Sequence, residues 1–113
     1  MATIRYIEDE ETMSEALQSK HALILKNSTQ CGVSRFAMNE FKKFAEESSE
    51  NMGYYVVNVI ENRPLSQKIA EYTGITHQSP QAIYIKDGHP VWNASHMRIT
   101  KRELNTLMEH FEG

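Results

Sequence analysis

The sequence predicts an α/β fold in which a central mixed sheet of four to five strands is flanked by helices on both faces. Two apolar runs, residues 22–25 and 54–60, have the composition of strands that are buried on both sides. A segment with apolar residues at helical spacing follows each run, and an Asp-Gly turn signal at residues 87–88 separates two further apolar stretches. Strands that alternate with helices pair in parallel through right-handed crossovers, whereas a hairpin adds antiparallel strands. The sheet is therefore expected to be mixed.

Composition limits the classes of protein to consider. The chain has 113 residues, which we expect to form one domain over residues 1–113. Its formal net charge is -3 and its basic residues are scattered, so no basic surface for nucleic acid is predicted. Residues 1–13 lack the basic and apolar segments of a secretory signal, and no apolar run approaches the roughly 20 residues that span a bilayer. We expect a cytoplasmic protein, favour a monomer, and expect neither nucleic acid nor a membrane as partner.

The first elements are short. Residues 3–7 predict a weak edge strand. Thr12 and Glu15 fit a capping box, in which the two side chains satisfy free amides at a helix start. A short helix that runs to about Lys20 is therefore expected.

The next two elements are stronger. Residues 22–25 are apolar at every position, which predicts a strand covered on both faces. From Cys31 onward, apolar residues recur at three- and four-residue steps and charged residues fall mostly between them, which predicts a long amphipathic helix. Its apolar residues are Val33, Phe36, Ala37, Phe41, Phe44 and Ala45.

The C-terminal half repeats this alternation. Residues 54–60 predict a buried strand, and Pro64 suits the first turn of a helix that ends at Gly74. We expect Leu65, Ile69 and Tyr72 on the apolar face of that helix.

A hairpin and a helix complete the chain. Residues 82–85 and 90–92 flank the turn signal and predict its two strands. Thr100 and Glu103 predict the start of a last helix whose apolar face carries Leu104, Leu107, Met108 and Phe111. The complete order of strands and helices is that of a thioredoxin-like fold.

The single cysteine, Cys31, lies between the first buried strand and the long helix. Free amides of Val33 and Ser34 are expected to point toward its sulfur, and such a helix terminus lowers the pKa of a thiol. One cysteine cannot form an intramolecular disulfide, which fits a reducing compartment. The alternative is an inert buried thiol, but the surrounding residues are polar or small: Asn27, Ser28, Thr29, Gln30, Gly32 and Ser34. We predict that Cys31 is a catalytic nucleophile.

Ser34 occupies the position of the second cysteine in a C-x-x-C redox motif. In dithiol enzymes that cysteine resolves the mixed disulfide, which an alcohol oxygen cannot do. Cys31 is therefore expected to stop at a mixed disulfide and to need an outside thiol. We predict that Ser34 is a second catalytic residue that donates a hydrogen bond to the thiolate; the alternative is an ordinary first-turn residue. Gly32 is expected to leave the sulfur open to a disulfide, with a simple turn residue as the alternative.

Ser79 and Pro80 precede the hairpin. In a thioredoxin-like fold a proline at this point is cis and faces the active cysteine, and the preceding residue offers backbone hydrogen bonds to the substrate; a plain trans turn is the alternative. The five histidines show no metal-ligand spacing, so we expect no metal and no tightly bound cofactor. The residues predicted to bind substrate are Thr29, Gly32, Val33, Ser79 and Pro80.

On the basis of these residues, the chain resembles the monothiol bacilliredoxins, thioredoxin-like proteins of bacteria that use bacillithiol in place of glutathione. The resemblance covers nearly the whole chain and rests on residues 25–34, 59–64, 77–81 and 91–96. The sequence departs from the family pattern at Asn27, commonly histidine, and at Gly32, commonly proline.

The resemblance implies the removal of bacillithiol from S-bacillithiolated proteins, with bacillithiol as a co-substrate. It implies that Cys31 attacks the bacillithiol sulfur, frees the protein thiol and stays bacillithiolated until another small thiol resolves it. The serine at position 34 leads to the same expectation, a mixed disulfide on Cys31 that an outside thiol must resolve.

Two other functions are compatible with one cysteine. The Cys-Gly-Val-Ser stretch is close to the Cys-Gly-Phe-Ser of monothiol glutaredoxins that carry an iron-sulfur cluster. Those proteins have a Gly-Gly pair after the hairpin, where this chain has residues 92–95, Trp-Asn-Ala-Ser. The other is a non-catalytic thioredoxin-like adaptor, for which Cys31→Ser would change nothing.

Overall fold

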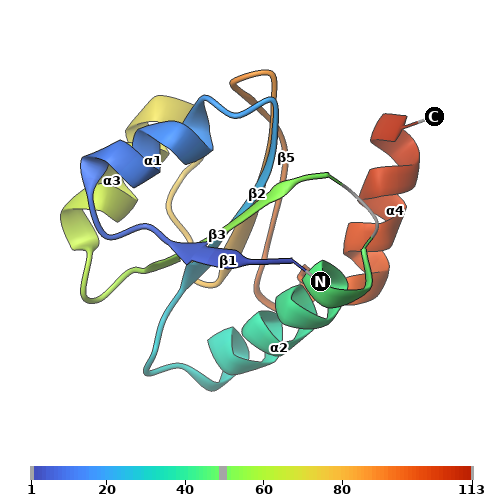
Figure 1. Cartoon of the computed structure of the whole chain (residues 1–113). Coiled ribbons are helices and arrows are strands. Elements are labelled where there is room, and N and C mark those ends of the chain that lie inside the picture. The colour runs from blue at the N-terminus through green and yellow to red at the C-terminus, as the bar shows by residue number, and fades with distance from the viewer. Residues whose placement is uncertain (1, 49–50, 113) are drawn as a thin grey trace.

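A five-stranded mixed sheet forms the centre of the protein (Figure 1). The computed structural model describes residues 2–48 and 51–112. The strand order is β1-β3-β2-β4-β5, in which β2 pairs in parallel with β3 and antiparallel with β4. The strands are β1 (Ile4–Tyr6), β2 (His21–Asn27), β3 (Gly53–Asn58), β4 (Gln81–Lys86) and β5 (His89–Ser95). The predicted mixed sheet is confirmed.

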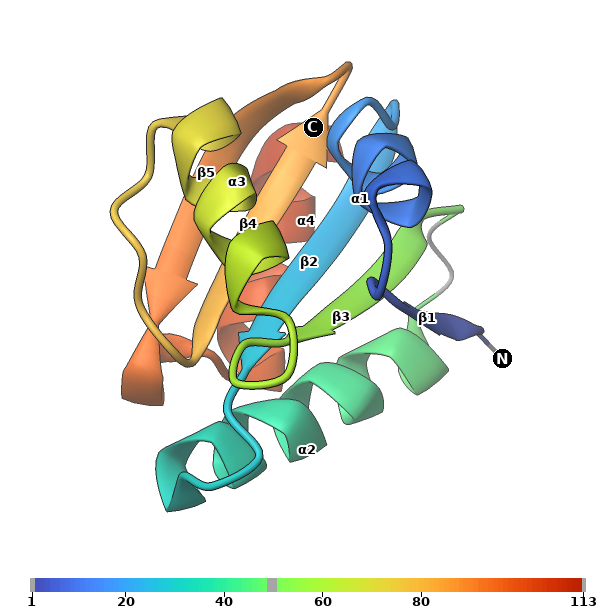
Figure 2. The same cartoon turned by 90° about the vertical axis from the view of Figure 1, so that its left-hand side faces the viewer.

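Helices cover both faces of this sheet, as predicted. Helices α1 (Glu10–Leu17) and α3 (Arg63–Thr73) lie on one face, and α2 (Gly32–Glu47) and α4 (Lys101–Glu112) lie on the other (Figures 1 and 2). A short 3-10 turn, η1 (His96–Arg98), connects β5 to the segment before α4. Within the described residues, no helix has the length and apolar character needed to cross a bilayer.

The central strand β2 divides the core into two layers. Leu23 and Leu25 pack toward α2 and α4, whereas Ala22 and Ile24 pack toward α1 and α3. Successive side chains of a strand point to opposite faces, so Lys26 continues the second set. All residues from Ala22 to Asn27 are buried, which confirms a strand covered on both faces.

The start of α1 differs from the prediction. The helix begins at Glu10, and the Asp9 carboxylate accepts a hydrogen bond from the Thr12 N–H at 2.7 Å. Glu10 and Glu11 add negative charge at the positive end of the helix dipole. The predicted capping box at Thr12 is therefore wrong, because Asp9 provides a cap three residues earlier and Thr12 lies inside the first turn. The helix also ends at Leu17, before the expected Lys20.

Two aromatic residues predicted on buried helix faces are exposed. Phe36 is 37% exposed and Tyr72 is 50% exposed. Phe36 lies beside the buried stripe of α2, and the Tyr72 hydroxyl lies near the end of α3 and donates a hydrogen bond to the Gly88 carbonyl at 3.1 Å. Both rings thus border the core and do not fill it.

Two further boundaries bear on the site. The third strand ends at Asn58, two residues before the predicted end, and Val59 and Ile60 lead into the turn before α3. The predicted cap of α4 is confirmed, since the Thr100 hydroxyl accepts a hydrogen bond from the Glu103 N–H at 3.0 Å.

Candidate active site

Cys31 is the N-cap residue of α2, four residues after the end of β2. Its backbone is extended, with φ -123° and ψ 128°, and its carbonyl accepts a hydrogen bond from the Arg35 N–H at 3.1 Å. The Cys31 N–H donates to the Ser28 carbonyl at 3.3 Å, which closes the turn before the helix. The side chain is partly exposed. The sulfur therefore lies at the N-terminus of α2, where the sequence predicted it.

The first turn of α2 acts on this sulfur. The backbone N–H groups of Ser34 and Val33 lower the pKa of the Cys31 thiol; burial opposes this lowering, and the Ser34 hydroxyl makes the smallest contribution, which also lowers the pKa. Free amides at a helix start carry a partial positive charge that favours the thiolate. The direction is the one expected from the sequence.

Ser34 is fully buried beneath the turn that carries Cys31. Its Oγ accepts a hydrogen bond from the Ser28 N–H at 3.1 Å. The hydroxyl thus contacts the amide of Ser28, and it also lowers the pKa of Cys31. Gly32, by contrast, is exposed, and a Cβ added there would meet no atom within 4 Å.

The turn is also joined to the adjacent strand. The Asn27 side-chain amide donates to Asn58 Oδ1 at 2.9 Å, and the Val59 N–H donates to the Asn27 carbonyl at 2.9 Å. In addition, the Thr29 hydroxyl, in the turn before Cys31, donates a hydrogen bond to the Glu61 carboxylate at 3.4 Å. Asn27, where the family pattern commonly has histidine, is buried and holds the ends of β2 and β3 together.

A cavity of about 270 Å³ opens beside Cys31. Two of its lining side chains, Arg35 and Lys42, are basic and lie on the same face of α2 as the cysteine. The cavity is lined by Asn27, Ser28, Thr29, Cys31, Arg35, Met38, Asn39 and Lys42. A small polar molecule joined to the sulfur would therefore meet amide, hydroxyl and cationic groups.

The peptide bond between Ser79 and Pro80 is cis, which confirms that prediction. Pro80 directly precedes Gln81, which pairs with Lys26 of β2. The two residues thus lie at the same end of the sheet as the turn of Cys31 (Figure 2). Of the predicted site residues, Thr29 and Cys31 line the cavity beside the sulfur, whereas Gly32, Val33, Ser34, Ser79 and Pro80 do not.

A buried lysine near this end of the sheet was not predicted as a site residue. Lys26 is 0% exposed, and its Nζ has no hydrogen-bond partner among the described residues. Burial lowers the pKa of its ammonium group to about 8. The sequence does contain a signal, because a charged residue continues a fully apolar strand without a break.

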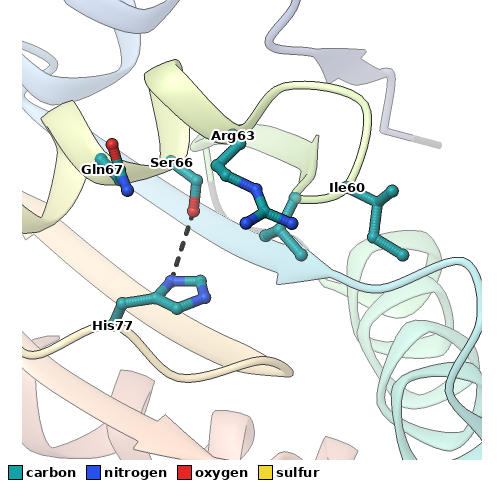
Figure 3. Close-up of a pocket in the computed structure, with 6 residues that line it drawn as sticks. Ile60, Arg63, Ser66, Gln67 and His77 are labelled. Carbon is teal, nitrogen blue, oxygen red and sulfur yellow. Dashed lines mark hydrogen bonds between the residues drawn. The ribbon is translucent and has the colours of Figure 1, made fainter.

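A second cavity, also absent from the sequence predictions, lies on the α3 side of the sheet (Figure 3). Arg63 and Ser66 project into it from α3, and His77 faces them from the segment before Pro80. The Ser66 hydroxyl and His77 Nδ1 are 3.3 Å apart and share a hydrogen bond. Ser66 and His77 are 11 residues apart in the sequence, and the fold brings them together across the turn that follows α3.

Comparison with known proteins agrees with this geometry. The family model described as monothiol bacilliredoxin BrxC matches residues 2–104. A solved structure of a candidate oxidoreductase with a thioredoxin fold is 32% identical, with 91% of each chain covered and a TM-score of 0.83.

More distant structures share the fold alone. A thioredoxin variant from Halobacterium salinarum NRC-1 is 17% identical over 97% of this chain and 91% of its own, with a TM-score of 0.77. The thioredoxin of Malassezia sympodialis is 18% identical over 100% of this chain and 94% of its own, with a TM-score of 0.78.

Family and fold together indicate a thiol redox function, for which the chain offers one thiol, that of Cys31. The family model matches nearly the whole chain. The structure places Cys31 at the start of α2, with a serine three residues later. The chain belongs to the monothiol bacilliredoxin family.

Proposed function

We propose that this protein removes bacillithiol from S-bacillithiolated proteins by thiol-disulfide exchange at Cys31. The observation that carries the proposal is the position of that sulfur. It lies at the start of α2, where the backbone amides of Ser34 and Val33 lower its pKa, and the residue that could resolve a disulfide from within the chain is a serine. Such a site can accept one thiol compound and then depends on another.

In the first step, the Cys31 thiolate attacks the bacillithiol sulfur of the mixed disulfide on the substrate. The bond between bacillithiol and the substrate cysteine breaks, and a new disulfide joins bacillithiol to Cys31. The substrate sulfur departs with the electron pair and takes a proton from solvent. The amides of Val33 and Ser34 support this step because they lower the pKa of Cys31 and so favour its thiolate.

In the second step, the thiolate of another bacillithiol attacks the bacillithiol sulfur bound to Cys31. The products are bacillithiol disulfide and the free Cys31 thiolate, so one disulfide is consumed and one is formed. Ser34 takes no covalent part, and we assign it as the residue that stabilises the Cys31 thiolate through its hydroxyl. No metal or tightly bound cofactor is needed for either step.

The cavity beside Cys31 supports the binding of a polar thiol compound. Arg35 and Lys42 supply positive charge along α2, and Thr29 supplies a hydroxyl. We assign the backbone around Gly32, Val33, Ser79 and Pro80 to the substrate polypeptide, because these residues border the sulfur or lie at the same end of the sheet (Figure 2). S-bacillithiolated proteins and bacillithiol are the proposed partners.

Mass spectrometry after incubation with bacillithiol disulfide tests the proposal. We expect one bacillithiol adduct per chain, located on Cys31, absent from Cys31→Ser and released by free bacillithiol. A bacillithiolated substrate protein should lose its modification in the presence of the wild-type protein only. Glutathione disulfide serves as the matched reagent for selectivity.

Two results would overturn the proposal. One is a chain that forms no adduct although its thiol reacts with iodoacetamide. The other is a Cys31→Ser variant that removes bacillithiol from the substrate as well as the wild type does.

A further inference from the structure

The cavity between α3 and the segment before Pro80 has a volume of about 240 Å³. Its polar lining groups are those of Arg63, Ser66, Gln67 and His77, and none of them is acidic. In Figure 3 the Arg63 guanidinium points into the space between His77 and Ile60. The cavity therefore combines hydrogen-bond donors and a positive charge with two apolar lining residues, Val59 and Ile60.

Lys26 adds a second cation on the same side of the sheet. It follows Ala22 and Ile24 in the strand alternation, so its side chain extends toward α3. Burial lowers the pKa of His77 most, and the positive charges of Lys26 and Arg63 lower it further. The unpartnered amine of Lys26 is thus buried on the same side of the sheet as this cavity, although Lys26 is not among the residues that line it.

No carboxylate balances these charges within the described part of the chain. The ion pairs found there involve Arg5, Lys43, Lys68 and Lys101 as the cations. A buried ammonium without a counter-ion costs several kcal/mol of solvation free energy, as an order of magnitude. An anion in the cavity would offset that cost.

We infer that this cavity binds a carboxylate group, with the Arg63 guanidinium as a two-point donor and the Lys26 ammonium as the compensating buried charge. Ser66 and Gln67 would complete the donor set. Arginine is suited to this role because its planar fork matches the two oxygens of a carboxylate. His77 stays neutral and is held in place by its hydrogen bond to Ser66.

Two sources could supply the carboxylate. It could belong to a free small molecule, or to the thiol compound that is joined to Cys31, in which case this part of the inference rests on the proposed function. The cavity and the cysteine turn are neighbours, since the Val59 N–H donates to the Asn27 carbonyl and Thr29 donates to Glu61. Both sources share one chemistry and can be separated by experiment.

Titration with succinate, followed through the His77 ring signals by NMR, tests the site. We expect saturable binding and a rise in the pKa of His77, because a nearby negative charge favours the imidazolium form. Lys26→Met and Arg63→Gln should each weaken succinate binding about tenfold or more, as for the loss of a hydrogen bond to a charged group. The exposed Arg102→Gln on α4 is the matched control and should bind as the wild type does.

The bacillithiol adduct on Cys31 separates the two sources. Loss of succinate binding in the adduct assigns the carboxylate to the thiol compound, and unchanged binding assigns it to a free molecule. The Cys31→Ser variant keeps the cavity, so its titration stands even if the proposed redox reaction fails. Absence of saturable succinate binding, or binding that neither substitution weakens, would overturn the inference.

Discussion

Ser34 Oγ accepts a hydrogen bond from the backbone N–H of Ser28 at 3.1 Å, beneath the turn that carries Cys31. The serine that replaces a second thiol is therefore also a structural part of the turn. Its hydroxyl contacts the strand side of the turn and also lowers the pKa of Cys31. Removing the hydroxyl should affect both the position of the turn and the acidity of Cys31.

Ser34→Ala should raise the pKa of the Cys31 thiol and destabilise the fold. The Ser28 N–H loses its partner in a partly buried position, which costs about 1 kcal/mol of unfolding free energy. Urea unfolding measures the stability, and the rate of iodoacetamide alkylation against pH measures the thiol. The exposed Ser14→Ala on α1 is the control; equal behaviour of the two variants would contradict a role for the Ser34 hydroxyl.

Ser34→Cys should convert the single-thiol site into a dithiol site. The second sulfur would attack the mixed disulfide on Cys31, so the bacillithiol adduct should become transient and a disulfide within the chain should replace it. Mass spectrometry would then show a loss of two hydrogens in place of the added thiol compound. A stable adduct in this variant would mean that position 34 does not reach the Cys31 sulfur.

The reactivity of Cys31 should follow its lowered pKa. Because the folded chain favours the thiolate, the alkylation rate should reach half of its maximum at a pH below the ordinary thiol value of about 8.5, and should fall as the pH drops through the folded pKa. The same titration in urea supplies the reference. Coincident curves in the folded and unfolded chains would show that the amides of Val33 and Ser34 have no effect.

Gly32→Pro should stabilise the protein without changing the thiol. Gly32 is the first residue of α2, where proline is favoured, and a Cβ there meets no atom within 4 Å. The extended backbone of Cys31 suits a residue that precedes proline. The thiolate donors are the amides of Val33 and Ser34, which the change leaves in place.

For Gly32→Pro we expect about 0.4–1 kcal/mol of added stability, seen as a rise of a few degrees in Tm. Gly32→Ala is the matched control for loss of glycine flexibility alone. A lower Tm, or a thiol pKa raised toward the ordinary value, would contradict this account of the turn.

Lys26→Met should stabilise the fold at neutral pH, although it removes a charge that the cavity uses. The ammonium has a pKa of about 8 in the folded chain against 10.5 in the reference state, so the unfolded chain holds one more proton between these values. Unfolding free energy should therefore rise with pH from about 8 to 10.5 in the wild type.

In Lys26→Met that rise should be absent, and the variant should be more stable at pH 7 by up to about 3 kcal/mol. Guanidinium unfolding at a series of pH values measures both effects. The exposed Lys20→Met is the control and should keep the pH dependence of the wild type. A less stable Lys26→Met would show that the buried amine has a partner in the apo protein.

The sequence allowed the sheet, the helix order and the place of Cys31 to be predicted, because all three depend on local periodicity. The cis bond before Pro80 followed from the fold and its position in the chain, not from a local signal. Asp9 and Thr12 both suit a helix cap, and only packing decides between them. The roles of Cys31 and Ser34 in the exchange reaction stay predictions.

The second cavity could not be predicted in this way. Lys26 continues an apolar strand, but lysine is seldom buried, so the sequence did not decide whether its amine lies inside the protein. Arg63 and His77 are separated in sequence by nearly the whole of α3 and the loop after it. Their meeting above β2 depends on how α3 packs on the sheet, which periodicity does not specify.

The amides at the start of α2 affect the release of the thiol compound from Cys31 as well as its capture. A sulfur whose anion is stabilised is also a good leaving group, so the disulfide formed on Cys31 breaks readily when an outside thiol attacks. The same two N–H groups that speed capture thus hasten release. In the proposed reaction, a chain with a single thiol can in this way turn over many times, provided that free thiol is abundant.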